Sequence, residues 1–288
     1  MNKIANYVFF EKIGQGAFGT VFKGKNIKTG ENVVIKTEKF CVEFSSLKHE
    51  SSILNILYSK NCRNIPPTYW YGTTTVEPIC RVLVMPFYEE SLETRNGFQL
   101  CNIMRSAISI LSHIHDKYVV HRDIKPANFM IHNDELMLID FGLASFYVDS
   151  EERHILPANP KKRDIIGTPK YTSWNIHRGE EYSRRDDLMS VIYIGLFLLY
   201  GPDLWTNYNN QTQTQTQTQT QTQTHLCNKT DIMHPRNTWF ESQKNIDNIR
   251  YLSSNWRELG LFAESIYGLS FQERPSYNDY IKLFEETI

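Results

Sequence analysis

The feature that most constrains this chain is the segment His121–Asn128, of sequence HRDIKPAN, which is followed by a DFG tripeptide that begins at Asp140. Asp123 is a candidate proton acceptor, and Lys125 is a candidate cation for a phosphate group. Asn128 and Asp140, twelve positions apart, offer the hard oxygen ligands that Mg²⁺ prefers. This grouping of a base, a cation and two metal ligands predicts chemistry on a phosphate group.

A glycine-rich segment lies upstream, at residues 13–21, with the pattern GxGxxGxV. Glycines allow a backbone to lie close to phosphate groups, where a side chain would clash. A dinucleotide-binding fold shares the GxGxxG part, but there the glycines join a strand to a helix, whereas here they join two predicted strands. We therefore expect a hairpin over the phosphates of a nucleotide.

Lys36 ends an apolar run, seventeen positions after Gly19. On a strand beside the hairpin, its ammonium would reach the α- and β-phosphates, and an acid on a neighbouring helix would hold it there. We expect Glu50 to be that acid, with Glu43 and Glu38 as alternatives. A lysine in such a run can also be a surface residue. However, the glycine-rich segment, the Lys36 strand, HRDIKPAN and DFG follow one another in the order found in protein kinases.

The adenine end of the predicted site lies where a strand ends at Met85. Pro86 has no N–H and can offer only its carbonyl, so Tyr88 would supply the backbone donor. Val21, just after the glycines, suits a position that covers the adenine. The residues expected to contact the nucleotide are Ile13, Gly14, Gln15, Gly16, Ala17, Phe18, Gly19, Val21, Val34, Lys36, Met85, Pro86 and Tyr88.

Strands and helices are predicted for different parts of the chain. Strands are expected at residues 7–12, 20–26, 32–37, 69–74 and 81–85, which are rich in β-branched and aromatic residues. Helices are expected at residues 43–58, 100–114 and 181–200, and in two segments between 245 and 288. We expect an α+β, bilobal protein-kinase fold. Its N-terminal β-rich lobe, residues 1–88, would hold one main helix, and its larger, mostly helical C-terminal lobe would be residues 89–288.

Size and charge limit the remaining possibilities. The chain has 288 residues and a formal net charge of −1, which argues against a general binder of nucleic acid or membrane surfaces. Its start lacks a long apolar segment, and its longest apolar run, residues 191–200, is far shorter than the roughly 20 residues of a membrane-spanning helix. We expect a monomer in the cytoplasm or nucleus.

Two features predict no chemistry. Residues 211–224 are seven Gln-Thr dipeptides, and we expect the low-complexity insert 207–224 to be a solvated loop because this repeat has no apolar side chains to bury. An alternating polar segment can also add to a β-type assembly. The five cysteines are scattered without a CxxC pair, so we expect free thiols.

Two further strings resemble the casein kinase 1 family rather than protein kinases in general. Gly167–Asn175 reads GTPKYTSWN, with Ser173–Asn175 where most protein kinases have Ala-Pro-Glu, and Ser183–Leu188 reads SRRDDL. The resemblance extends from about Tyr7 to Phe284, apart from the Gln-Thr insert. It implies a Ser/Thr kinase that uses ATP and Mg²⁺ and favours acidic or already phosphorylated protein substrates.

The resemblance also implies roles for individual residues. Lys170 and Arg163 match a basic pocket for a substrate phosphate, to which Arg122 could add. Asp187 matches an aspartate that braces the HRD backbone, and Thr168 matches a residue that contacts the catalytic aspartate. The basic run that ends at Arg163 can also be a solvated loop or a localisation signal. The Gln-Thr insert lies where the family has further basic residues, so none is assigned there.

Two other functions remain open. The vaccinia-related kinases are a neighbouring branch, although the HRDIKPAN and SRRDDL strings favour the first family. A kinase fold can also serve as a scaffold without activity. Such scaffolds usually lack one of Lys36, Asp123, Asn128 and Asp140, and this chain has all four.

Overall fold

The computed structural model describes residues 3–16, 19–40, 45–74, 79–94, 99–157, 165–202, 204 and 240–285. They belong to two compact units. The first comprises Met1–Phe98, Ser109–His121 and Pro126–Phe146, and the second comprises Gln99–Ile108, Arg122–Lys125 and Tyr147–Ile288. Because the units alternate along the chain, no single position divides them, and the expected boundary at residue 88 stays a prediction. Ala17, Phe18, Arg163 and the Gln-Thr insert lie outside the described residues.

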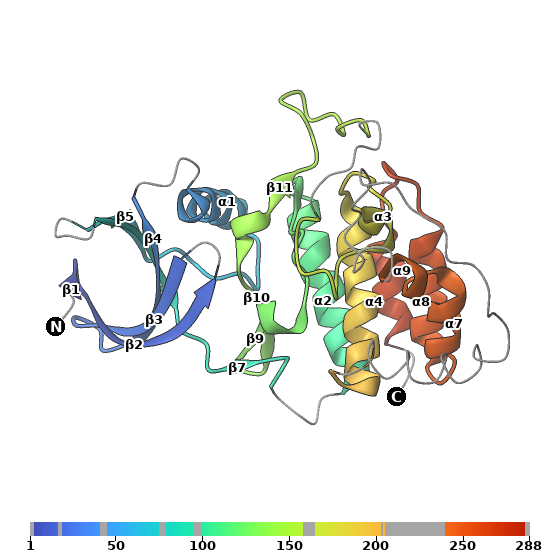
Figure 1. Cartoon of the computed structure of the whole chain (residues 1–288), viewed down its shortest axis with the longest axis horizontal. Helices are drawn as coiled ribbons and strands as arrows, with labels where there is room; N and C mark the ends of the chain where they lie inside the picture. The colour runs from blue at the N-terminus through green and yellow to red at the C-terminus, as the bar shows by residue number, and fades with distance from the viewer. Residues whose placement is uncertain are drawn as a thin grey trace, which may run out of the picture. The chain divides into compact units, whose positions relative to one another are not determined.

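The first unit contains a six-stranded antiparallel sheet with the order β1-β2-β3-β4-β6-β5. Its strands are β1 (Lys3–Ile4), β2 (Tyr7–Gly16), β3 (Gly19–Asn26), β4 (Asn32–Lys39), β5 (Trp70–Thr73) and β6 (Cys80–Pro86). Figure 1 shows β2 to β4 as a curled blue sheet. Alternate residues of β4 and β6 bury Val33, Ile35, Val82 and Val84 in one core, as period-two patterning requires.

The glycine-rich segment is a continuation of this sheet. The strand expected to end at Lys12 instead runs to Gly16, because pairing with β3 continues as far as Gly16 opposite Gly19. The register shifts twice along this hairpin, between Phe9 and Glu11 and between Lys12 and Gly14. Such irregularities increase strand twist and bend. The segment is therefore the distal end of a hairpin, as expected.

One main helix, α1 (Ser46–Ser59), accompanies the sheet and contacts β4 and β6. The prediction of a start at Glu43 is wrong, because Ser45 is the N-cap and its side chain accepts a hydrogen bond from Lys48 N at 3.0 Å. The buried face of the helix includes Leu47, Ser51, Ile53, Leu54, Leu57 and Glu50. Because a buried carboxylate loses its contact with water, Glu50 needs a hydrogen-bonding or positively charged partner.

The rest of the first unit holds a three-stranded sheet, ordered β10-β9-β7, and a two-stranded one. The elements are β7 (Glu90–Ser91), β8 (Val119–Val120), η1 (Pro126–Asn128), β9 (Phe129–His132), β10 (Glu135–Leu138), η2 (Phe141–Leu143) and β11 (Ser145–Phe146). Asn128 directly precedes β9, and Asp140 lies two positions after β10. Since these strands form a hairpin, with Ile139 N donating to Asn128 O at 2.9 Å, both candidate metal ligands lie at its base.

The second unit is helical. The helices whose full extent is described are α3 (Trp174–His177), α4 (Arg184–Tyr200), α7 (Ile246–Leu252), α8 (Arg257–Tyr267) and α9 (Tyr277–Leu283), and α2 (Leu100–His115) contributes residues to both units. The apolar α4 (yellow in Figure 1) packs tightly, since a Cβ at Gly195 would lie 2.9 Å from Leu259 of α8 and 3.3 Å from Met104 of α2. The predicted α+β content, with a β-rich first half and a helical second half, is confirmed.

Two boundaries in this unit differ from the expectation. The helix expected from residue 181 begins at Arg184, because Ser183 is the N-cap and its N–H donates to Asp186 Oδ2 at 2.7 Å. The two segments expected after residue 245 are three helices, α7, α8 and α9. None of the helices among the described residues is long and apolar enough to cross a membrane.

Candidate active site

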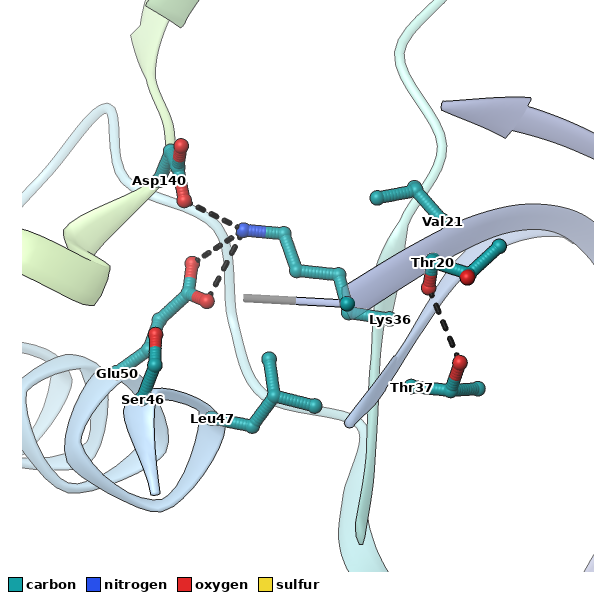
Figure 2. Close-up of a pocket in the computed structure, with 9 residues that line it drawn as sticks. Thr20, Val21, Lys36, Thr37, Ser46, Leu47, Glu50 and Asp140 are labelled. Carbon is teal, nitrogen blue, oxygen red and sulfur yellow. Dashed lines mark hydrogen bonds and ion pairs between the residues drawn. The ribbon is translucent and has the colours of Figure 1, made fainter. Parts of the chain in front are cut away.

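Lys36 of β4 lies between two carboxylates of the first unit (Figure 2). Its Nζ is 2.8 Å from Glu50 Oε1 and 3.0 Å from Glu50 Oε2 on α1, and it is 2.8 Å from Oδ1 of Asp140, just before η2. The side chains of Lys36 and Glu50 are 15% and 1% exposed. Lys36 is therefore not a surface lysine, and the structure places Glu50 beside it, as expected.

Lys36 is the positive charge between the two carboxylates of this cluster. Burial alone would lower the pKa of Lys36, but the charges of Glu50 and Asp140 and their hydrogen bonds raise it above its ordinary value. Burial raises the pKa of Glu50, and Lys36 opposes that shift. The amine is thus held as an ammonium, which is the form that binds phosphate.

Glu38, an alternative candidate for the acid beside Lys36, instead contacts the start of α1. Its Oε1 accepts from Ser46 N at 2.8 Å, and its Oε2 accepts from Ser45 Oγ at 2.5 Å. Arg81 Nη1 lies 3.4 Å from the same carboxylate. Glu38 therefore caps the start of α1. The other alternative, Glu43, lies outside the described residues.

A cavity of about 360 Å³ opens beside Lys36, within the usual range for ligand sites. It is lined by Ile13, Gly14, Val21, Val34, Lys36, Pro66, Met85, Pro86, Phe87, Tyr88, Ala127, Asn128, Met130, Ile139 and Asp140. Most of these side chains are apolar, whereas Lys36, Asn128 and Asp140 are polar or charged. An apolar cavity with a few polar groups suits a flat base joined to phosphates.

Most of the expected nucleotide residues line this cavity, but some do not. Gly19 lines a smaller cavity of about 110 Å³ that Lys36, Glu50 and Asp140 also border. Gln15 is exposed and accepts a hydrogen bond from Lys12, and Gly16 pairs with Gly19. Sequence reasoning missed Pro66, Ala127, Met130 and Ile139.

The connector after Met85 leaves one backbone donor. Pro86 has no N–H, and Phe87 N donates to Asn32 O at 3.4 Å. The N–H of Tyr88 forms no hydrogen bond with any residue that the structure describes. Tyr88 also lines the cavity, and its N–H stays the predicted donor to a ligand there.

Gly19 cannot be replaced without strain. Its φ is +145°, and a Cβ there would lie 1.9 Å from Thr37 O. A side chain at this position would push β3 away from β4. The last glycine of the motif therefore fixes how closely the hairpin approaches Lys36.

The segment that carries Asp140 is set by its buried neighbours. His121 Nε2 lies 3.0 Å from Ile139 O, and the His121 ring meets the Phe141 ring at 4.8 Å. His121 and Phe141 are both fully buried, so they pack in the core beside this segment. Asp140 itself has a φ of +69°, in the left-handed region that aspartate adopts more readily than most residues other than glycine.

The donor set at Asn128 and Asp140 fits Mg²⁺ bound together with a nucleotide. Both residues line the same cavity, and the Asp140 side chain is 44% exposed, so its carboxylate is accessible. Mg²⁺ keeps several water molecules and needs only one or two protein carboxylates when phosphates supply the other ligands. An amide oxygen and a carboxylate meet that need.

Asp123 lies in the second unit and is held by two neighbours. Its Oδ1 accepts from Thr168 N at 2.9 Å and from Thr168 Oγ1 at 2.8 Å. Its Oδ2 is 2.6 Å from Lys125 Nζ, which is also 3.0 Å from Thr168 Oγ1. The contact expected from Thr168 to the aspartate is present, and it fixes the direction of the carboxylate.

The backbone before Asp123 is braced by Asp187, whose Oδ1 accepts from Arg122 N at 3.0 Å. Arg122 has a φ of +68°, which costs energy for a non-glycine residue. This is the bracing contact expected of Asp187. Burial lowers the pKa of the Arg122 guanidinium, and Tyr182, Asp187 and Glu181 raise it.

The expected basic pocket is described only in part. The ammonium of Lys170 donates to Pro202 O and lies 6.0 Å from the Phe197 ring centre. The charged groups near Arg122 include the carboxylates of Asp187 and Glu181. Arg163 lies outside the described residues. The pocket stays a prediction.

The comparison with known families agrees with this geometry. A model of the protein kinase domain matches residues 7–283 of the chain, which is nearly its whole length. The match includes the hairpin, Lys36, the Asp123 segment and all the described helices. It extends over the Gln-Thr insert as well.

Proposed function

This chain belongs to the protein kinase domain family, and from that premise we propose that it phosphorylates Ser and Thr hydroxyls of acidic or phosphate-primed proteins. As a protein kinase, it is a phosphotransferase that uses ATP, typically with Mg²⁺, and acts on protein substrates. The observation that carries the proposal is the position of Lys36, held as an ammonium by Glu50 and Asp140 at the edge of an apolar cavity. Phosphoryl transfer depends mainly on such positioned charges.

The residues of the first unit bind and orient the nucleotide in this proposal. The apolar lining of the cavity holds the base, and the Tyr88 N–H and Pro86 carbonyl contact its edge. Lys36 binds the α- and β-phosphates, and Asn128 and Asp140 hold Mg²⁺. The bound metal ion supplies charge neutralisation on the phosphate oxygens.

Asp123 accepts or orients the proton of the substrate hydroxyl. Thr168 donates twice to one carboxylate oxygen, so the aspartate cannot rotate freely. Lys125 contacts the other oxygen at 2.6 Å and carries the positive charge expected beside the transferred phosphoryl group. An oriented carboxylate and a nearby cation suit transfer to a hydroxyl.

The finer assignment to a casein kinase 1-like enzyme rests on the two strings that differ from most protein kinases. These strings pack together, because Asp186 Oδ1 accepts from Ser173 Oγ at 2.5 Å and from Asn175 Nδ2 at 3.1 Å. Burial raises the pKa of Asp186 to about 6, although these hydrogen bonds oppose the shift. A buried network that needs all three side chains supports treating the strings as one family feature.

Preference for acidic or primed substrates rests on the same resemblance and on Lys170. The ammonium of Lys170 reaches Pro202 O, one residue beyond Gly201, at the end of α4. Its present partner is a neutral carbonyl, which a phosphate would outcompete as an acceptor. The proposal therefore assigns Lys170 to the recognition of an upstream phosphate.

Radiolabelled ATP and an acidic casein-like peptide test the function, followed by phosphoamino-acid analysis of the product. We expect label on Ser or Thr with the wild type and no detectable transfer with Asp140→Ala. Asp279→Ala, which removes an exposed carboxylate, is the matched control and should keep full activity. Nucleotide binding by the wild type without transfer to any peptide would instead support the scaffold function.

A further inference from the structure

Lys244 is a fully buried lysine that none of the predicted roles uses. Its relative exposure is 0%, and it lies just before α7 in the second unit. Lysine is rarely buried completely, because its amine then loses the hydrogen bonds of water. The groups that replace those hydrogen bonds indicate what the residue does.

The amine of Lys244 contacts the backbone of the Thr168–Thr172 turn. Its Nζ lies 2.9 Å from Pro169 O and 2.5 Å from Thr172 O. His177 Nε2 is 3.3 Å from the amine and 3.1 Å from Pro169 O. Two carbonyls of one turn are thus joined by a single side chain.

The same turn holds Asp123. The carbonyl of Thr168 accepts from Tyr171 N at 2.8 Å, from Thr172 N at 2.9 Å and from Thr172 Oγ1 at 3.0 Å. The N–H and hydroxyl of Thr168 point the other way, to Asp123 Oδ1. A shift of the turn would therefore move the two donors that orient the aspartate.

Lys244 is itself firmly placed. Its Nζ lies 4.5 Å from the centre of the Tyr193 ring and 5.0 Å from that of Phe240. Its own carbonyl accepts from Tyr267 Oη at 2.7 Å, and the hydroxyls of Tyr267 and Tyr193 are 2.9 Å apart. The amine is fixed by aromatic rings on one side and by the turn on the other.

The contacts do not depend on the charge of the amine. Burial lowers the pKa of Lys244 well below its ordinary value. An ammonium has three N–H groups and a neutral amine has two, so either form can donate to both carbonyls. The link between Lys244 and the turn is therefore a hydrogen-bonded clamp.

We propose that Lys244 is a positioning residue for phosphoryl transfer, which orients Asp123 by clamping the Thr168–Thr172 turn. This inference rests on the proposed function, because it assigns Lys244 to the orientation of the proton acceptor. The contacts of Lys244 named above all lie within the second unit, whereas the residues that line the nucleotide cavity belong to the first. Removal of Lys244 should thus affect the chemical step and not nucleotide binding.

The test compares Lys244→Met, which keeps the size of the side chain and loses the donors, with Lys282→Met at an exposed lysine of α9. The rate of phosphoryl transfer is expressed per functional nucleotide-binding site, so that unfolded protein does not lower the apparent kcat. We expect kcat of Lys244→Met to fall by about 10- to 100-fold with KM for ATP unchanged, because small misplacements of catalytic groups cost this much. Lys282→Met should match the wild type.

A double-mutant cycle with Thr168→Val separates positioning from a general structural role. If Lys244 acts through the turn, Lys244→Met should lower kcat less in the Thr168→Val background than in the wild type, because, of the two Thr168 donors, only the N–H is left to orient Asp123. If Lys244→Met does not fold, Tyr267→Phe decides, since it removes the one hydroxyl that donates to the Lys244 carbonyl and contacts the Tyr193 hydroxyl. It should lower kcat about threefold, as expected for one neutral hydrogen bond that acts indirectly.

The outcomes distinguish the two proposals. A wild type without any transfer would overturn the proposed function and this inference together. An active wild type with an unchanged kcat in Lys244→Met, or in Tyr267→Phe if that variant decides, would overturn the inference alone. Additive losses in the double mutant would also overturn it, because Lys244 would then act independently of Thr168.

Discussion

Lys36 Nζ lies 2.8 Å from Asp140 Oδ1, although the two residues are 104 positions apart in the chain. The contact joins a strand of the larger sheet to the segment that follows the β9–β10 hairpin, within one compact unit. It brings the predicted phosphate-binding cation next to a predicted metal ligand. Binding of a nucleotide together with Mg²⁺ requires a phosphate-binding cation and a metal ligand close to each other.

Glu50→Gln should weaken the use of ATP. The substitution removes one of the two negative charges that hold Lys36 and leaves the amide able to accept only one of its hydrogen bonds. We expect kcat/KM for ATP to fall by about 30-fold, as for the loss of a buried charged partner. Steady-state kinetics with varied ATP measure this.

Glu38→Gln is the matched control for that experiment. Because Glu38 accepts from Ser45 and Ser46 and pairs with Arg81, its loss should lower the melting temperature and leave KM for ATP unchanged. A raised KM in Glu38→Gln with a normal KM in Glu50→Gln would reverse the assignment of the two acids.

Gly19→Ala should impair nucleotide binding. The new Cβ would lie 1.9 Å from Thr37 O, so β3 must move relative to β4. We expect KM for ATP to rise about tenfold, in line with the cost of a strained backbone. Gly30→Ala is the control, since its φ of +78° is also positive but its Cβ would meet only the end of Lys25, at 3.9 Å. Equal effects of both substitutions on KM would disprove a specific role for the close approach at Gly19.

Lys170→Glu should change the choice of substrate more than the overall rate. We expect activity on a phosphate-primed peptide to fall about tenfold relative to the unprimed peptide, which corresponds to one charge-assisted contact of about 1.4 kcal/mol. Lys282→Glu changes an exposed lysine of the same unit by the same charge and should affect both peptides equally. If Lys170→Glu also lowers both rates equally, Lys170 does not recognise the priming phosphate.

His177 should make the folded state sensitive to acid. Burial and the nearby Lys244 lower the pKa of His177 to about 3, from an ordinary value of 6.5. Below pH 6.5 the unfolded chain therefore binds more protons than the folded one, so stability falls as the pH falls toward 3. The slope from this residue is about 1.4 kcal/mol per pH unit.

Urea unfolding of the wild type and His177→Gln at several pH values between 7.5 and 4.5 isolates this contribution. The difference in unfolding free energy between the two proteins should shrink as the pH falls, because only the wild type loses the contribution of His177. A difference that stays constant over this range would show that His177 titrates normally in the folded protein.

Much of the nucleotide site could be predicted because its residues are defined locally. The glycine spacing, the apolar strand around Lys36 and the short distance from Asn128 to Asp140 are all properties of neighbouring positions. Each requires a particular residue type, such as a glycine at the positive φ of Gly19. The sequence alone does not select the acid beside Lys36, because Glu38, Glu43 and Glu50 lie close together in it.

Other parts could not be predicted, for physical reasons. Met130 and Ile139 line the cavity, yet apolar residues in short strands look the same whether they face a core or a ligand. The start of α1 depends on Glu38, a cap supplied by the preceding strand rather than by the helix itself. Lys244 binds backbone carbonyls, which every sequence has, so no partner residue marks its role.

The most direct test of the central claim is kcat for phosphoryl transfer to an acidic peptide by Asp123→Asn at saturating Mg-ATP. The asparagine keeps the shape of the side chain but cannot accept the proton of a hydroxyl. We predict that kcat falls by at least about 100-fold, the usual contribution of a general base, while ATP affinity stays unchanged. An Asp123→Asn variant that transfers phosphate at the wild-type rate would contradict the account.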